Sequence, residues 1–204
     1  MQVLKIYPNS INERFIEQAV EALRDGEVIL YPTDTLYAFA CDALNRRAIE
    51  RLCKIKNLDP DKNLLSIVCP DISHAAEYAK IDNKAFQVLK RYLPGPFTFI
   101  LPASTKLPKV FKGRKTVGVR VPDNNIVVAL ADALGNPLLT SSVDIDVDEP
   151  ENSVEPESLA LTYAGAVNLI IDGGTGNAVA STIVNLVESD SPEVVREGMG
   201  VFEG

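Results

Sequence analysis

The chain has 204 residues, of which 46% are hydrophobic and 24% charged, a composition typical of a globular protein that can bury its own core. Its apolar runs are strand-sized and fall far short of the roughly 20 residues that cross a bilayer, so the sequence predicts no membrane span. The net charge of −8 argues against a surface that coats nucleic acid, because such a surface needs a broad positive face.

The first half of the chain alternates predicted strands and helices. Residues 1–7 read as a short strand without the apolar stretch or cleavage site of a signal peptide, so we expect a cytoplasmic protein. Ile11, Phe15 and Leu23 recur at helical spacing, with Asn9-Ser10 as the expected N-cap and Gly26 closing the helix. The further predicted elements are strand 28–31, helix 48–56, strand 64–69, helices 72–79 and 84–92, and strand 97–101.

The second half continues the alternation without a regular strand–helix–strand repeat. The predicted elements are strand 116–121, helix 126–134, strand 137–142, helix 158–164, and strands 167–171, 182–187 and 193–196. Between them, residues 144–157 hold two prolines and few apolar residues, which predicts a flexible loop. The pattern favours one α/β domain over residues 1–204, an open, twisted, mixed sheet flanked by helices.

The cysteines and the histidine point away from a metal site. Cys41, Cys53 and Cys69 are odd in number and have no metal-binding spacing, so we expect part-buried thiols in a reducing compartment. His74 is the only histidine, and we expect it on the surface of a helix or half-buried.

Charge is distributed unevenly along the chain. Residues 144–157 contain seven acids and no base, whereas residues 106–120 contain six bases and no acid. Two interpretations stay open at this point. The segments form either an acidic, mobile rim beside a basic concavity or two ordinary solvated faces.

Familiar catalytic motifs are absent. The sequence has no P-loop and no G-x-G-x-x-G after a strand, and residues 173–176 fit a turn better than a phosphate cradle. Hydroxyl residues instead gather at three strand ends, around residues 33–35, 140–142 and 181–182. Cations stand near other element ends, and phosphate ligands need cations with neutral donors. Taken singly, each hydroxyl reads as a turn cap, each lysine as a solvated charge, and Arg120 as an arginine on an exposed strand face.

Six segments, in order, resemble those of the YrdC-like superfamily, and the ending is most similar to the YciO branch. They are Tyr31-Pro32-Thr33-Asp34-Thr35-Leu36-Tyr37, Pro94-Gly95-Pro96-Phe97-Thr98, Thr116-Val117-Gly118-Val119-Arg120-Val121-Pro122, Pro137-Leu138-Leu139-Thr140-Ser141-Ser142, Ser181-Thr182-Ile183-Val184 and Arg196-Glu197-Gly198.

The resemblance implies a twisted α/β fold with a concave basic groove. It also implies the activity of the superfamily's synthases, which join L-threonine, bicarbonate and ATP into threonylcarbamoyl-AMP and release pyrophosphate, for modification of a tRNA adenosine. The residues that it implies as threonine contacts are Thr33, Thr35, Arg120 and Ser181. Those that it implies around the nucleotide are Thr116, Ser142, Asp144 and Arg196, with Lys56 and Lys62 beside the phosphates.

Two positions depart from the synthase pattern. Leu58 stands where the synthases carry Arg in K-x-R, and Asp144 where they carry Asn in S-x-N. Leucine lacks the bidentate fork that holds a phosphate, and an aspartate repels a triphosphate unless a metal such as Mg²⁺ bridges the two. We therefore expect weak or altered synthase activity, and a requirement for Mg²⁺ stays open.

Three functions remain in view. The first is a nucleotide-binding enzyme of the synthase type, with ATP, AMP and L-threonine as ligands. The second is an enzyme that cleaves an acyl-adenylate. The third is a module that binds double-stranded RNA or tRNA, which the net charge disfavours unless the positive charges are segregated.

Overall fold

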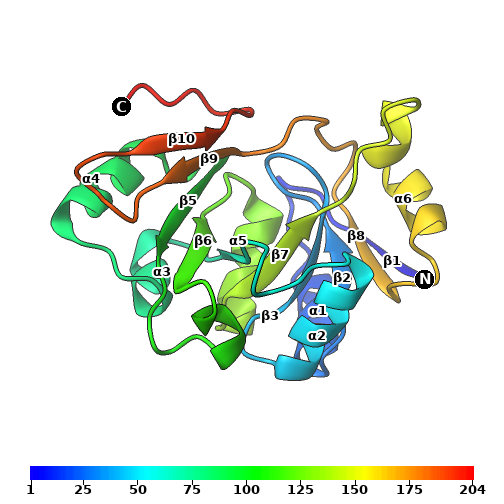
Figure 1. Cartoon of the computed structure of the whole chain (residues 1–204). Coiled ribbons are helices and arrows are strands. Elements are labelled where there is room, and N and C mark those ends of the chain that lie inside the picture. Colours follow the sequence, from blue (N-terminus) through cyan, green and yellow to red (C-terminus); the bar gives the residue numbers. More distant parts are fainter.

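The computed structural model describes residues 1–204, and one ten-stranded twisted sheet runs through it from end to end (Figure 1). The strands follow one another across the sheet in the order β1-β8-β2-β3-β7-β4-β6-β5-β9-β10. Their bounds are β1 Gln2–Lys5, β2 Ile29–Tyr31, β3 Ala38–Asp42, β4 Ser66–Val68, β5 Phe97–Pro102, β6 Thr116–Arg120, β7 Leu138–Ser142, β8 Leu169–Asp172, β9 Thr182–Asn185 and β10 Glu193–Arg196.

The sheet is mixed, as the sequence predicts. β8 pairs in parallel with β1 and β2, β4 with β6, and β5 with β9, whereas β3 and β7 run antiparallel to each other and to their other neighbours. Both edges are open. At one of them β10 is exposed along its whole length and shifts register against β9 between Val194 and Arg196.

Six helices accompany the sheet, and five of them begin at an Asn or Asp side chain that accepts a backbone N–H. Their bounds are α1 Glu13–Arg24, α2 Arg46–Ile55, α3 Ile72–Tyr78, α4 Asn83–Tyr92, α5 Asn125–Leu134 and α6 Pro156–Thr162, with 3₁₀ turns at Lys109–Lys112 and Pro150–Ser153. The expected cap of the first helix, Asn9-Ser10, is wrong, because Asn12 caps α1. No helix is both long and apolar enough to cross a bilayer.

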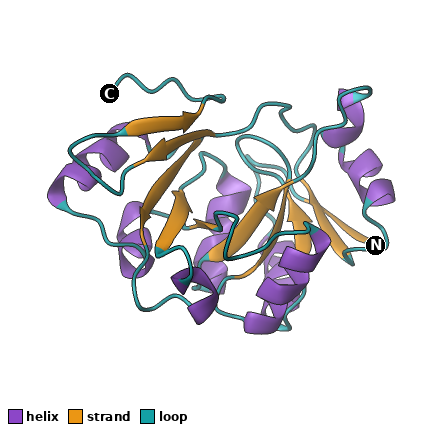
Figure 2. Cartoon of the chain, viewed as in Figure 1, coloured by secondary structure: helices purple, strands orange, loops and turns teal.

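Helices cover the two faces of the sheet unequally (Figure 2). One face packs on α2, α3, α4 and α6, through residues such as Leu52, Ala75, Leu89 and Leu159. The other face packs on α1 and α5, and this second cluster includes no residue of β5, β6 or β9. The part of this face formed by β6, β5 and β9 is therefore without a helical cover.

Three expectations need correction and one is confirmed. β3 lies in a stretch with no predicted strand, because all five of its residues are buried and give no polar–apolar alternation. The acidic segment is partly structured, since it contains a 3₁₀ turn and the start of α6. The three cysteines are free thiols, but they are buried rather than part-buried, and burial raises the pKa of each. His74 is half-buried on α3, as expected.

Candidate functional site

A groove of about 540 Å³ opens on the part of the sheet that no helix covers. Strands β4, β5, β6, β7 and β9 supply its floor, and the ends of α2 and β10 supply its rim. Its lining is mainly polar and includes three cations, Lys56, Arg120 and Arg196. The groove therefore brings together side chains that lie up to 160 positions apart in the chain, from Leu36 to Arg196.

Strand register orders the floor into rows. Val68 of β4 pairs with Arg120 of β6 and with Leu138 of β7, which defines the arginine row. Two residues along each strand, Ser66 pairs with Gly118 and Thr140, which defines the middle row. A further two residues along lie Thr116 of β6 and Ser142 of β7, the outer row. Alternation turns the three rows to the same face, about 6.6 Å apart.

Arg120 is the deepest cation of the groove. Its side chain is 3% exposed, and its Nη2 donates to Asp34 Oδ1 at 2.8 Å and to Thr35 Oγ1 at 3.0 Å. Asp34 is held in turn by the backbone N–H of Asp123 at 3.1 Å. The Nε of Arg120 is buried without a hydrogen-bond partner. Buried donors are rarely left unpaired, so this group is suited to an anionic ligand in the groove.

A second guanidinium lies beside the start of β9. Arg196 Nη2 donates to the carbonyl of Ser181 at 2.8 Å, and the hydroxyls of Ser181 and Thr98 are hydrogen-bonded at 2.8 Å. Burial, and next the charge of Arg120, lowers the pKa of Arg196. An arginine keeps its proton despite such a shift, so two positive charges share this end of the groove.

The remaining cation, Lys56, follows α2 at the other end. Its side chain is only 8% exposed, lies over the Phe39 ring with Nζ 5.8 Å from the centroid, and donates to Asp144 Oδ1 at 2.6 Å. The Asp144 side chain is 85% exposed. A carboxylate of the protein therefore already holds the lysine that the sequence predicts beside phosphates.

The structure brings most, but not all, of the predicted site residues to the groove. Thr35 lies behind its wall, bonded to Arg120, and Thr33 bonds to Thr35 and to the Leu36 carbonyl while facing a separate cavity of about 510 Å³. Thr116 has the right face but does not line the groove. The predicted site residues that do line it are Lys56, Arg120, Ser142, Asp144, Ser181 and Arg196.

Two positions of the segment after α2 also lie off the floor. Lys62 is exposed and pairs with Asp59 at 3.4 Å. Leu58 packs against the larger hydrophobic core. The loop between α2 and β4 thus places Lys56 and Leu64 in the groove, and Lys56 is its only cation there.

Four polar lining residues were not predicted as site residues: Ser66, Thr98, Thr140 and Ser141. Thr98 and Thr140 lie inside segments that carry the family resemblance, so they were available as candidates. Ser66 is the only polar residue of an otherwise apolar strand, and that interruption was its only signal.

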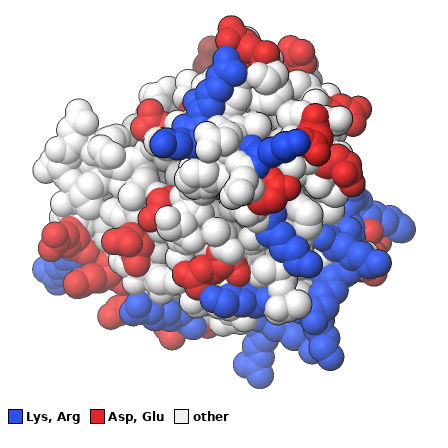
Figure 3. Space-filling view, turned by 90° about the vertical axis from the view of Figure 1, so that its left-hand side faces the viewer, with Lys and Arg blue, Asp and Glu red and all other residues white.

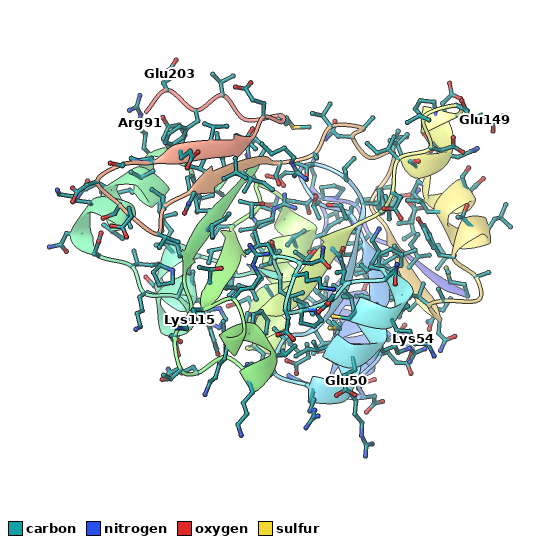
Figure 4. All side chains as sticks on the ribbon, viewed as in Figure 1. Glu50, Lys54, Arg91, Lys115, Glu149 and Glu203 are labelled. Atoms are coloured by element: carbon teal, nitrogen blue, oxygen red, sulfur yellow. The ribbon has the colours of Figure 1, made fainter.

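The basic and acidic segments do not form neighbouring walls. Figure 3 shows lysine and arginine side chains gathered low on the right of one face of the molecule, whereas in Figure 4 Lys115 lies toward the lower left and Glu149 at the upper right. The exposed bases of the 106–115 segment are Lys106, Lys109, Lys112, Arg114 and Lys115. None of them lines the groove. The acidic segment contributes only Asp144 and Ile145 to the groove lining. An acidic rim beside a basic concavity is therefore wrong for most of both segments.

Sequence comparison places the chain among known proteins. The family model Sua5_yciO_yrdC, described as "Telomere recombination", matches residues 21–198. YciO of Escherichia coli (strain K12) is 40% identical over 201 residues, which cover 98% of this chain and 96% of that protein. A threonylcarbamoyl-AMP synthase of Bacillus subtilis (strain 168) is 33% identical over 193 residues, which cover 93% of this chain and 55% of the synthase.

Solved structures agree with the sequence comparison. The crystal structure of E. coli YciO matches with a TM-score of 0.90 at 38% identity, covering 99% of this chain and 98% of that one. The crystal structure of Pyrococcus abyssi Sua5 complexed with L-threonine matches with a TM-score of 0.85 at 29% identity, covering 97% of this chain and 58% of that one. The twisted mixed sheet that the resemblance implies is confirmed.

Proposed function

This chain belongs to the Sua5/YciO/YrdC family, and from that premise we propose that it is a nucleotide-binding enzyme of the threonylcarbamoyl-AMP synthase type with weak or altered activity. In the proposed reaction the amine nitrogen of L-threonine forms a bond to the carbon of bicarbonate, and water leaves, which gives a carbamate. An oxygen of the resulting carbamate then attacks the α-phosphorus of ATP. The new phosphorus–oxygen bond displaces pyrophosphate, which leaves threonylcarbamoyl-AMP.

The observation that carries the proposal is the buried, incompletely paired guanidinium of Arg120. Arg120 lines a polar groove and its buried Nε has no partner in the protein, so its guanidinium is suited to the carboxylate of a bound amino acid, and Thr35 and Asp34 hold the guanidinium in place. The structure of the relative Sua5 was solved in complex with L-threonine, which supports the same ligand here.

Arg196 and Ser142 are proposed to contact the nucleotide. Arg196 lies at the groove wall with its guanidinium already fixed on the Ser181 carbonyl, so little side-chain entropy is lost when it meets a phosphate. The Ser142 hydroxyl lines the groove in the outer row and makes no hydrogen bond to the protein. Both groups are therefore available to a ligand without breaking a contact.

Asp144 is the reason that we propose weak or altered activity. The departing pyrophosphate gains negative charge, and a positioned cation normally stabilises it. Here the candidate cation, Lys56, is bound to Asp144 at 2.6 Å. ATP must displace that carboxylate and also tolerate its charge, unless Mg²⁺ bridges the two anions. Leu58 supplies no compensating donor, since its side chain packs on the core.

The decisive experiment incubates the purified protein with ATP, L-threonine and bicarbonate, with and without Mg²⁺, and measures pyrophosphate and threonylcarbamoyl-AMP directly. We expect slow formation of both, and AMP or ATP should raise the melting temperature by mass action. Arg196→Ala should reduce that rise without unfolding the protein. Arg46→Ala is the matched control, because Arg46 is exposed and pairs only with Glu50 on α2. Absence of product together with equal nucleotide binding by wild type and Arg196→Ala would refute the proposal.

A second candidate function, RNA binding, is favoured by one observation. Leu107 and Phe111 are buried in the core and pin the 106–115 segment, so its bases project into solvent. Lys109, Lys112 and Lys115 form no ion pair. Binding of a double-stranded RNA should then weaken steeply with salt, and Lys109→Ala/Lys112→Ala should lower the salt slope by roughly two. No binding at low salt would leave the enzyme proposal alone.

A further inference from the structure

Ser66 occupies the centre of the groove floor. It lies in the middle row, between Gly118 of β6 and Thr140 of β7. Arg120, the proposed threonine contact, is one row away on one side, and Ser142, the proposed nucleotide contact, is one row away on the other. Each step is about 6.6 Å along the strands, so Ser66 stands midway along a path of about 13 Å.

The hydroxyl of Ser66 is free for a ligand. Two neighbouring floor hydroxyls are engaged, since Thr98 Oγ1 bonds to Ser181 Oγ at 2.8 Å and Thr140 Oγ1 bonds to the Tyr31 hydroxyl at 2.9 Å, whereas the free hydroxyl of Ser142 lies one row further out. Ser66 Oγ makes no hydrogen bond within the protein, although the residue is half-buried and lines the groove. A lone half-buried hydroxyl is a donor and an acceptor without a partner.

Gly118 makes the space in which this hydroxyl sits. A β-carbon on Gly118 would overlap Ser66 Oγ and would lie 3.0 Å from Thr98 Cγ2. Any larger residue at position 118 would therefore displace the hydroxyl or fill the middle of the groove. The glycine of the Thr116–Arg120 strand thus gives the floor its depth at this row.

Charge is absent from the middle row, and this sets the chemistry of what it can contact. The cations lie outside this row: Arg120, the proposed threonine contact, is at one end, Lys56 is at the other, and Arg196, a proposed nucleotide contact, lies at the end of β10 beside the start of β9. A ligand that suits this pattern carries an anionic group toward each end and a neutral polar link between them. In an acyl-adenylate that link is the carbonyl and bridging oxygen of the mixed anhydride.

We infer that Ser66 is a ligand contact that recognises the acyl–phosphate link of an adenylate, donating its hydroxyl proton to the link's carbonyl oxygen. The inference rests on the proposed function, because it takes the threonine and nucleotide ends as assigned there. It makes Ser66 a specificity-determining residue, which distinguishes the joined adenylate from its two separate halves. A serine here has no packing purpose, since β-branched apolar residues suit a strand better.

The test measures affinities by titration calorimetry for three probes: AMP, L-threonine, and a stable analogue of the adenylate in which a sulfamate replaces the phosphate and carries the N-carbamoyl-threonine group. Ser66→Ala should weaken binding of the joined probe roughly five- to tenfold, the value of one hydrogen bond, and change AMP and L-threonine less than twofold. Gly118→Ala should give the same pattern, because its methyl group takes the place of the hydroxyl. Ser73→Ala, an exposed serine of α3, should change nothing.

The outcomes separate the inference from the function on which it rests. Equal binding of the joined probe by wild type and Ser66→Ala would overturn the inference and leave the proposed function standing. If Ser66→Ala weakens AMP binding as much as binding of the joined probe, the inference is also overturned, since Ser66 would then contact the nucleotide. If wild type binds none of the three probes, both the proposed function and the inference fail. Melting temperatures within a few degrees of wild type would show that each variant is folded.

Discussion

The two ends of the groove hold their cations in different ways. At one end Arg120 pairs with Asp34, whose side chain is 9% exposed and is fixed by a backbone N–H. At the other end Lys56 pairs with Asp144, whose side chain is 85% exposed. A buried, fixed carboxylate orients its arginine and cannot leave, whereas an exposed one can leave and competes with a ligand for the lysine. Asp34 thus fixes the position of Arg120 at one end of the groove, whereas Asp144 competes with a ligand for Lys56 at the other.

Loss of the buried ion pair between Arg120 and Asp34 should have the largest effect. Arg120→Ala leaves Asp34 buried without its partner, so we expect a loss of about 3–5 kcal/mol in the free energy of unfolding. L-threonine affinity should fall at least a hundredfold, since a hydrogen-bonded charge contact is lost. Denaturant unfolding and calorimetric titration measure the two effects.

A double variant separates stability from binding at the same end. Asp34→Asn with Arg120→Ala removes the orphaned charge, so the free energy of unfolding should recover in part while L-threonine affinity stays low. Full L-threonine binding by a folded double variant would show that Arg120 is structural only.

Replacement of Asp144, the carboxylate that competes for Lys56, should have an intermediate effect. It should raise ligand affinity, where loss of Arg120 lowers it. Leu58→Arg with Asp144→Asn restores the synthase residue types, and we expect ATP affinity to rise about tenfold and threonylcarbamoyl-AMP formation to increase. Most of the gain should come from Asp144→Asn, because Leu58 packs on the core and its replacement costs stability. The two effects need not add at one ligand.

Asp148→Asn is the matched control, since it removes an exposed acid of the same segment away from the groove. ATP binding and product formation are measured for all variants side by side. A folded double variant that binds ATP no better and makes no more product would show that neither position limits the protein, and a different substrate would then be the better hypothesis.

The smallest effect should come from Thr98, which supports the proposed threonine contact Ser181. Thr98→Val keeps the shape of the side chain but removes the hydroxyl that bonds to Ser181 at 2.8 Å. We expect a two- to fivefold loss of L-threonine affinity and no change for AMP, because the released Ser181 hydroxyl samples other rotamers. Titration with each ligand separately checks this, and an equal loss for both would place Ser181 between the two ligands instead.

Most elements of this fold could be predicted, because their apolar residues recur with a clear period. The strand and helix periods predict β5, β6, β10 and α3 to within a residue or two. The exception is β3, whose five residues are buried on both faces and therefore carry no alternation. Local sequence has no signal for a strand in the middle of a sheet covered on both sides.

The site was only partly predictable, because it depends on register and on a loop. The residues alone favoured Arg120 on an exposed face, yet the loop between β2 and β3 brings Asp34 and Thr35 against it and buries it. The family motifs named Lys62 and Thr116, but neither lines the groove. Ser66 became visible only when the register placed it between two rows of predicted contacts. Such juxtapositions have no trace in spacing along the chain.

The exposed edge strand β10 has a consequence for self-association. An open edge presents unpaired N–H and C=O groups to other chains and can seed aggregation. Here the shifted register between Val194 and Arg196, the flanking Pro192 and the charges of Glu193 and Glu197 all oppose strand addition. Arg196 adds a further charge to this exposed edge strand, so it serves the solubility of the edge as well as the groove. Replacement of Arg196 by a β-branched apolar residue should make the β10 edge more prone to pair with other chains and should also impair the groove. Loss of ligand binding in such a variant should therefore be accompanied by precipitation on storage.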